Sequence, residues 1–114
     1  MSANIVSANL RLEHGVAPAE FDHVVETFAK LDHRLRSFDG QTIELRLHVK
    51  ERDTPSQHTT LEAHVASHPR FIATSSRTEF DQALAEVRDD MVRQLTDAKT
   101  ITEPRNNRSL RERG

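Results

Sequence analysis

The longest amphipathic stretch of the chain constrains the fold most strongly. Between residues 70 and 99 the sequence predicts a short strand, over Phe71 to Ser75, and then a long helix with one apolar stripe. Thr78 precedes this helix and Asp81 follows three residues on, a spacing close to a capping box. Because one stripe must be buried, the helix needs a sheet to cover. The stripe consists of Phe80, Ala83, Leu84, Val87, Met91, Leu95 and Ala98.

Segments upstream of this helix supply the sheet. Alternating apolar and polar residues predict strands over Asn4 to Leu12, Thr42 to Glu51 and His58 to Ala66. The second of these has one apolar and one charged face, which indicates a sheet covered on one side only. The segment Arg52 to Gln57 contains Asp-Thr-Pro-Ser and is expected to be a flexible loop. The charged face of the predicted strand Thr42 to Glu51 comprises Glu44, Arg46, His48 and Lys50.

A further helix is predicted between the first two strands. Pro18 suits its first turn, where the missing N–H costs nothing, and Asp39-Gly40 is expected to end it as a turn. The first two strands should be joined by a right-handed crossover, and the later strands by hairpins. We therefore expect a two-layer α+β domain over residues 1–99, in the order β-α-β-β-β-α, with a four-stranded sheet and both helices on one face. The helix predicted between the first two strands has an apolar face formed by Phe21, Val24, Val25, Phe28, Leu31 and Leu35.

Composition narrows the class of protein. A chain of 114 residues that is 35% hydrophobic can bury one modest core, and the absence of cysteine excludes a disulfide framework and thiolate chemistry. No apolar run approaches the ~20 residues of a membrane span, and no signal-peptide pattern opens the chain, so we expect a cytoplasmic protein without membrane association. Residues 100–114 contain four arginines and are expected to form a disordered basic tail, either an inert end or a phosphate-binding arm.

The sequence gives little support for a catalytic or metal-binding site. His58 and His64 would lie about 20 Å apart on a strand at ~3.3 Å per residue, and the chain has neither an HExxH motif nor a cysteine. Asp89 and Asp90 point about 100° apart on a helix, and Asp89 is spaced for an ion pair with Arg93. No nucleophile elbow, phosphate-binding loop or glycine-rich dinucleotide turn is present. We therefore expect no catalytic residues, no metal, no cofactor and no small-molecule substrate.

Basic residues off the apolar stripes are the more informative set. Two helices on one sheet could bring some of them together as a strip that contacts phosphates. The alternative is a solvated surface of mixed charge, which the six acidic residues of the last helix favour. A net charge of −2 does not decide between them, because the distribution of charge matters more than its sum. The candidate nucleic-acid-binding residues are Lys30, Arg34, Arg36, Arg88, Arg93 and Lys99.

Three short segments on this frame carry a family resemblance. They are Asn4-Ile5-Val6-Ser7 at the opening, Phe28-Ala29-Lys30-Leu31 in the first helix, and Arg93-Gln94-Leu95-Thr96 in the last. With them, residues 3–99 resemble the short ribosome hibernation promoting factors and ribosome-associated inhibitors, also called sigma-factor modulation proteins. The fold of that family agrees with the element order that periodicity predicts.

The resemblance implies a non-enzymatic protein, monomeric away from the ribosome, that binds the small ribosomal subunit. Such proteins lie in the channel for mRNA and tRNA, where basic side chains of the two helices contact 16S rRNA, and they inhibit translation. Lys30, Arg93 and Lys99 match basic positions of the family, whereas Asp90 and Asp97 fall where the family has basic residues. These departures motivate an alternative, in which the chain is a divergent protein-interaction module of the same fold with little rRNA binding.

Overall fold

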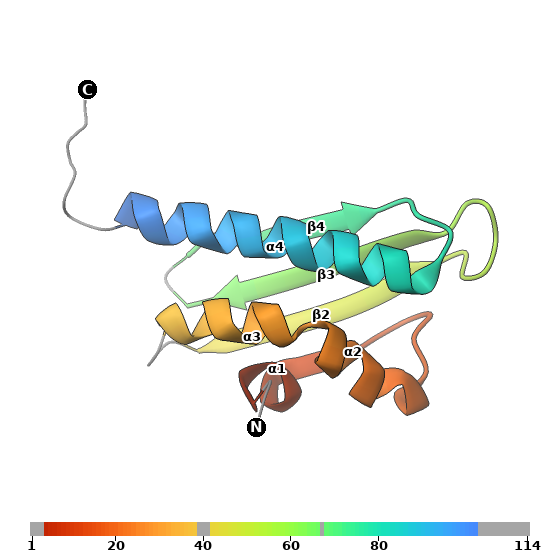
Figure 1. The fold of residues 1–114 in the computed structure, drawn as a ribbon, viewed down its shortest axis with the longest axis horizontal. Helices are drawn as coiled ribbons and strands as arrows, with labels where there is room; N and C mark the ends of the chain where they lie inside the picture. Colours follow the sequence, from red (N-terminus) through yellow and green to blue (C-terminus); the bar gives the residue numbers. More distant parts are fainter. Residues whose placement is uncertain (1–3, 39–41, 67, 103–114) are drawn as a thin grey trace.

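A four-stranded mixed sheet with helices on one of its faces forms the molecule (Figure 1). The computed structural model describes residues 4–38, 42–66 and 68–102. The spatial order of strands is β1-β2-β3-β4, with β1 parallel to β2 and the other neighbours antiparallel. This arrangement confirms the predicted α+β fold. The strands are β1 (Leu10–Leu12), β2 (Ile43–Lys50), β3 (His58–Val65) and β4 (Phe71–Ser75).

The predicted first helix is present but interrupted. It divides at Phe28, whose φ of −91° and ψ of 17° leave the helical region, although its N–H still bonds to the carbonyls of Val24 and Val25. Pro18 opens a 3₁₀ turn before it, as its fixed φ favours. The helical elements are α1 (Asn4–Asn9), η1 (Pro18–Glu20), α2 (Phe21–Thr27), α3 (Ala29–Leu35), η2 (Arg36–Phe38) and α4 (Phe80–Thr102).

A single core lies between the helices and the covered face of the sheet. Inward-facing Leu45, Leu47 and Leu61 are fully buried, while Arg46 and His64 on the opposite face are exposed. Burying one such aliphatic side chain contributes ~1.5–3 kcal/mol, so the stripe of α4 is a major source of stability. Phe80 and Ala98, at the ends of the predicted stripe, are only partly buried. The buried stripe residues of α4 are Ala83, Leu84, Val87, Met91 and Leu95.

The predicted first strand is wrong over most of its length. Only Leu10–Leu12 pairs with β2, whereas Asn4–Asn9 forms helix α1. Val6 is buried as expected, but Ala8 is exposed, because helical geometry turns it away from the face that Val6 and Leu10 share with the core. The alternating pattern of this segment therefore misidentified a short helix that leads directly into a short strand.

A buried carboxylate on α3 explains why the segment is helical. Asp32 is 1% exposed, and its Oδ1 accepts hydrogen bonds from the backbone N–H groups of Ile5 (2.6 Å) and Val6 (3.0 Å). The first N–H groups of a helix have no partner within it, so Asp32 satisfies donors that would otherwise be buried unpaired. Its Oδ2 lies 3.4 Å from Nη2 of Arg36, which balances the charge. This cap comes from a residue distant in sequence.

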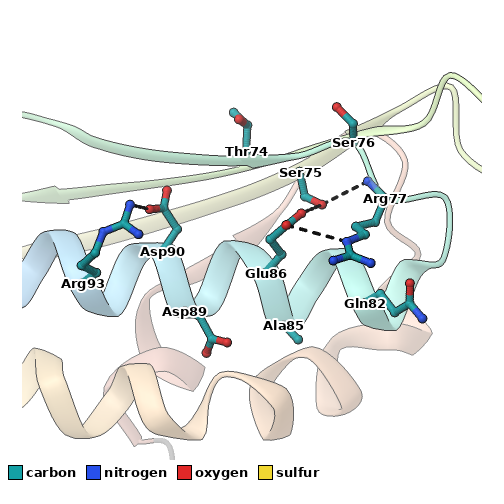
Figure 2. A pocket seen from close by; sticks show the side chains of 10 residues that line it. All are labelled: Thr74, Ser75, Ser76, Arg77, Gln82, Ala85, Glu86, Asp89, Asp90 and Arg93. Carbon is teal, nitrogen blue, oxygen red and sulfur yellow. Dashed lines mark hydrogen bonds and ion pairs between the residues drawn. The ribbon is translucent and has the colours of Figure 1, made fainter.

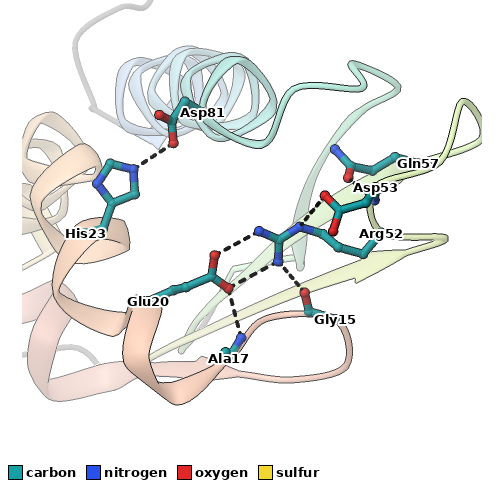
Figure 3. A network of polar contacts seen from close by, with 8 residues as sticks. All are labelled: Gly15, Ala17, Glu20, His23, Arg52, Asp53, Gln57 and Asp81. Carbon is teal, nitrogen blue, oxygen red and sulfur yellow. Dashed lines mark hydrogen bonds and ion pairs between the residues drawn. The ribbon is translucent and has the colours of Figure 1, made fainter.

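Arg52 ties the β2–β3 loop to two distant segments (Figure 3). Its guanidinium binds both carboxylate oxygens of Glu20, at 2.8 and 3.1 Å, donates to the carbonyl of Gly15 at 2.7 Å, and lies 3.9 Å from the centre of the Phe80 ring. Gly15 has a φ of +85°, and a Cβ there would lie 2.0 Å from the carbonyl oxygen of Val49, so the turn requires glycine.

The same loop is held internally, so the predicted flexible loop from Arg52 to Gln57 is instead tied down. Gln57 is 1% exposed, and its Oε1 accepts from the N–H of Asp53 at 2.9 Å (Figure 3). Its Nε2 donates to the carbonyl of Arg77 at 3.0 Å. Backbone groups of this loop are thus hydrogen-bonded within the protein, and the bond to Arg77 also fixes the segment that precedes α4.

Two expectations fall partly or wholly outside the described residues. The predicted turn at Asp39-Gly40 and the basic tail beyond Thr102 both lie outside them. The first residues assigned to the tail, up to Thr102, belong to α4, which continues three residues past the expected domain limit at 99. Among the helices that the structure describes, none is long and apolar enough to span a membrane.

Replacing Arg52 with Met should lower the free energy of unfolding by about 1–3 kcal/mol, because a partly buried, charge-assisted contact is lost. The hydrogen bond from Arg52 lowers the pKa of Glu20 below its ordinary value of 4.5. The stabilisation of the folded state by the Arg52–Glu20 pair is therefore present above pH 4.5. It disappears as the pH falls through the lowered pKa that Glu20 has in the folded state. In urea titrations below pH 4.5, the variant should lose less further stability than the parent.

Arg46→Met is the matched control, because it removes the same charge from an exposed pair with Glu44 on the open face of the sheet. Its stability should change little. Equal losses in the two variants would show that the contacts of Arg52 contribute nothing beyond a surface charge.

Replacing Asp32 with Ala should destabilise the protein by about 2–3 kcal/mol, because the N–H groups of Ile5 and Val6 lose their buried acceptor. Amide hydrogen exchange should show those two N–H groups exchanging faster relative to the amides of β2 and β3. Asp22→Ala, at an exposed position of α2, provides the control and should alter neither quantity. Unchanged exchange at Ile5 and Val6 in Asp32→Ala would refute the capping role.

Candidate nucleic-acid interface

The helices that carry the predicted basic residues lie side by side and run in the same direction (Figure 1). His23 on α2 bonds to Asp81 at 2.7 Å, and the carbonyl of Thr27 accepts from Nη1 of Arg88 at 3.2 Å. Later residues of α2 therefore meet later residues of α4, and the C-terminal ends of α3 and α4 lie at the same end of the sheet. Arg88 thus lies on the side of α4 that faces α2 and α3.

Lys30 and Arg34 provide the most available positive charge on α3. They are one turn apart, so their side chains are neighbours on the helix surface. Lys30 is exposed and has no hydrogen-bond or ion-pair partner among the described residues. Arg34 is half-buried, and its Nε is buried without a hydrogen-bond partner in the described part of the chain. Both side chains can take an external acceptor without first breaking an ion pair.

Arg36 and Arg88 are instead engaged inside the protein. Arg36 faces buried Asp32. Arg88 is 22% exposed at its side chain, with Nε 2.9 Å from Oδ1 of Asp89 and Nη1 on the Thr27 carbonyl. Arg88 therefore bridges the helices, and a phosphate there would compete with a carboxylate and a carbonyl.

Arg93 lies on the other flank of α4. Arg93 follows Arg88 by five residues, so the two positions lie about 140° apart around the helix axis. Arg93 points toward β4 and pairs with Asp90 of the same helix (Figure 2). The predicted pair between Asp89 and Arg93 is therefore wrong, since Asp89 pairs with Arg88. Lys99 lies eleven residues after Arg88, within about 20° of the same helix face, and its side chain lies outside the described part.

The six predicted residues thus do not form one strip. Helical rotation puts Lys30 and Arg34 on the flank of α3 opposite Asp32, the residue that bonds to α1, and Arg88 lies on the flank of α4 that meets Thr27. These three residues border the seam between α3 and α4, and the backbone at Lys99 continues it toward the end of α4. Arg93 belongs to the opposite flank and Arg36 to the end of α3. We refer to the first group, with position 99, as the helix seam.

A groove between β4 and α4 was not predicted from the sequence. It is an open groove of about 1110 Å³, lined on one side by the end of β4 and on the other by the flank of α4 that carries Arg93 (Figure 2). Ser75 donates from its hydroxyl to Glu86, and Gln94 donates to the carbonyl of Ile72 at 2.8 Å. The spacing of Glu86, Asp90 and Arg93 along one flank was the signal that could have identified it.

The histidines are dispersed over the structure. Within the described ranges, no three or more His, Asp and Glu side chains converge in an arrangement that could hold a metal ion. His23 instead contacts Asp81, and the ring of His68 packs edge-on against Phe38 with centres 5.2 Å apart. These contacts are structural.

Comparison with known proteins supports the fold. The chain matches no family model and no curated protein. Among solved structures, it is similar to the crystal structure of the N-terminal domain of Protein Y from Thermus thermophilus, with a TM-score of 0.57 and 13% sequence identity. The match covers 79% of this chain and 98% of that domain. At this identity the likeness shows a shared fold, the class of α+β domain to which the sheet and its helices belong.

The different environments of two arginines predict different stability effects. Arg88→Ala should lower the free energy of unfolding by about 1–2 kcal/mol, because the Thr27 carbonyl and Asp89 lose a half-buried donor. Arg93→Ala should cost only ~0.3 kcal/mol, because its pair with Asp90 is largely exposed. Urea denaturation of both variants measures the difference. A loss for Arg93→Ala as large as that for Arg88→Ala would contradict their placement.

Proposed function

We propose that this protein is a ribosome hibernation factor, which binds 16S rRNA in the mRNA and tRNA channel of the small subunit and inhibits translation. The observation that carries the proposal is the fold shared with the N-terminal domain of Protein Y, a member of the family that the sequence resembles. The order of short segments that resemble that family gives independent support.

The helix seam is the part of the surface best suited to phosphates. Lys30 and Arg34 are adjacent on one face of α3 and have no anionic partner among the described residues, so they can contact phosphates with little rearrangement. Arg88 can share its guanidinium between Asp89 and a phosphate. Recognition would be of backbone shape and charge, because RNA helices expose phosphates and hydroxyls more readily than base edges.

Under this proposal the protein acts by occupying space. A bound domain that fills the channel excludes mRNA and tRNA without making or breaking a covalent bond, so no catalytic group, cofactor or small-molecule substrate is required. The protein would be monomeric away from the ribosome and would act in the cytoplasm, where ribosomes are. Affinity would depend strongly on salt, because phosphate contacts release counterions.

A second candidate function is protein binding with little rRNA contact. The observation in its favour is that three of the predicted cationic residues are paired with carboxylates, namely Arg36, Arg88 and Arg93. Asp97 is exposed on α4 as well. A pull-down from lysate separates the two functions, since co-purified 16S rRNA supports the first and one stoichiometric protein without rRNA supports the second.

Reversing Lys30 and Arg34 to Glu should release the protein from ribosomes. Sedimentation through sucrose gradients at low and moderate salt measures how much protein co-migrates with small subunits. The double variant should bind weakly, and its plot of log affinity against log salt should be shallower by about 1.4–1.8, the value for two lost phosphate contacts. Circular dichroism should remain that of the parent, because neither side chain belongs to the core.

Arg46→Glu with Lys50→Glu is the matched control, because it makes the same charge change on the open face of the sheet. This variant should co-migrate like the parent. Failure of the parent itself to co-migrate with small subunits or whole ribosomes at either salt would overturn the proposed function. Equal loss in both double variants would place binding outside the helix seam.

A further inference from the structure

Lys30, His33 and Arg34 form a set of unengaged side chains on one helix, α3. Lys30 precedes the other two by three and four residues, so both are its neighbours on the helix surface, with Cβ atoms about 5–6 Å away. Lys30 and His33 are exposed, and Arg34 is half-buried. None of the three has a hydrogen-bond or ion-pair partner within the described part of the chain. An amine, an imidazole and a guanidinium are thus available together.

The two acidic residues nearest to Lys30 in the sequence leave its amine free. Asp32 lies about 200° away around the helix axis and accepts from backbone N–H groups of α1. Glu26 lies four residues before Lys30, on the other side of the helix break at Phe28, and no ion pair joins the two in the structure as described. The amine of Lys30 therefore meets solvent beside a cation and an imidazole rather than beside a carboxylate.

Arg34 and Lys30 differ in how firmly they are held. The Nε of Arg34 is buried without a hydrogen-bond partner among the described residues, so the guanidinium packs against the protein with an unused donor. Lys30 is exposed, and its four-carbon stem can turn. A guanidinium is a binding group for phosphate, whereas a lysine amine, once neutral, is a nucleophile. The pair combines a held phosphate-binding group with a reactive group that can move.

We propose that Lys30 is an acylation site, which acyl phosphates modify directly. Arg34 binds the phosphate end of the reagent, and a single bridging oxygen separates that phosphate from the acyl carbon, so the carbon lies within reach of a side chain one helical turn away. The amine nitrogen of Lys30 forms an amide bond with the acyl carbon, the bond from that carbon to the bridging oxygen breaks, and inorganic phosphate leaves. The imidazole of His33 accepts the proton that the nitrogen loses.

Acylation removes the positive charge of Lys30. Among the described side chains of the helix seam, only Arg34 then remains as a cation without an internal partner, since Arg88 is paired with Asp89. Phosphates would bind the seam more weakly, and ribosome binding would depend on the supply of acyl phosphates. This consequence rests on the proposed function, whereas the reactivity of Lys30 does not.

Treatment of the full-length protein with acetyl phosphate, without ribosomes, tests this proposal, with mass spectrometry of its peptides measuring the rate at each lysine. Lys50 is the internal reference. It is exposed and lies opposite His58 across the β2–β3 pair, but its neighbour Arg52 is held by Glu20. Lys30 should react about two- to fivefold faster than Lys50, the factor expected for one partly exposed ionic contact.

Arg34→Met should lower the rate at Lys30 to that at Lys50, because methionine keeps an apolar stem but cannot bind phosphate. The acetyl ester of N-hydroxysuccinimide has no phosphate, so the same variant should change its reaction with Lys30 much less. His33→Gln should slow the reaction of Lys30 with both reagents, because the proton acceptor is lost. Arg46→Met is the matched control, since it removes an exposed arginine from the open face of the sheet, and it should leave both lysines unchanged.

Three outcomes would overturn the proposal. One is an equal rate at Lys30 and Lys50 in the parent, a comparison that needs no variant. Another is an effect of Arg34→Met that is the same for acetyl phosphate and for the ester. The third is an equal loss at Lys30 in Arg46→Met, which would mean that the overall charge attracts the reagent. Every rate is measured on the free protein, so the outcome is independent of whether the protein sediments with ribosomes.

Discussion

Burial of the α4 stripe against one face of the sheet is the constraint on which the rest of the structure depends. The stripe residues from Leu84 to Leu95 are fully buried against β3 and β4, and each contributes ~1.5–3 kcal/mol. Once this face is fixed, the rotation of α4 is fixed too. Arg88 is thereby directed to the side of α2 and α3, whereas Glu86, Asp90 and Arg93 are directed to the side of β4. The function of each charge follows from that assignment.

Local carboxylates then decide which cations are available. Arg88 and Arg93 each have an acidic neighbour on the same helix, so a phosphate gains little at those positions beyond exchanging one anion for another. Lys30 and Arg34 form no ion pair in the described part of the chain, since Asp32 of the same helix pairs with Arg36. A net charge of −2 conceals this partition, because acids and bases that pair within one flank cancel in the sum.

Most of the fold could be predicted because it depends on local periodicity. The strands β2, β3 and β4 and the helix α4 follow from alternation and from the apolar stripe, and the structure confirms them. The helix at Asn4–Asn9 and the ordered loop after β2 could not be predicted, because they depend on Asp32 and Arg52, which act on segments far away in sequence. No window of local sequence contains both partners of such a contact.

The candidate site was only partly accessible from the sequence. Counting basic residues on α4 found Arg88 and Arg93, but the 140° between them, which helical geometry gives at once, separates them onto different flanks. What geometry alone could not give is which flank faces α3, since that depends on how α4 sits on the sheet. The acids opposite β4 are then a local property of one surface: they pair with Arg77 and Arg93 there and so weaken phosphate binding. The same helix therefore presents two surfaces of different preference, and the sheet beneath it keeps them apart.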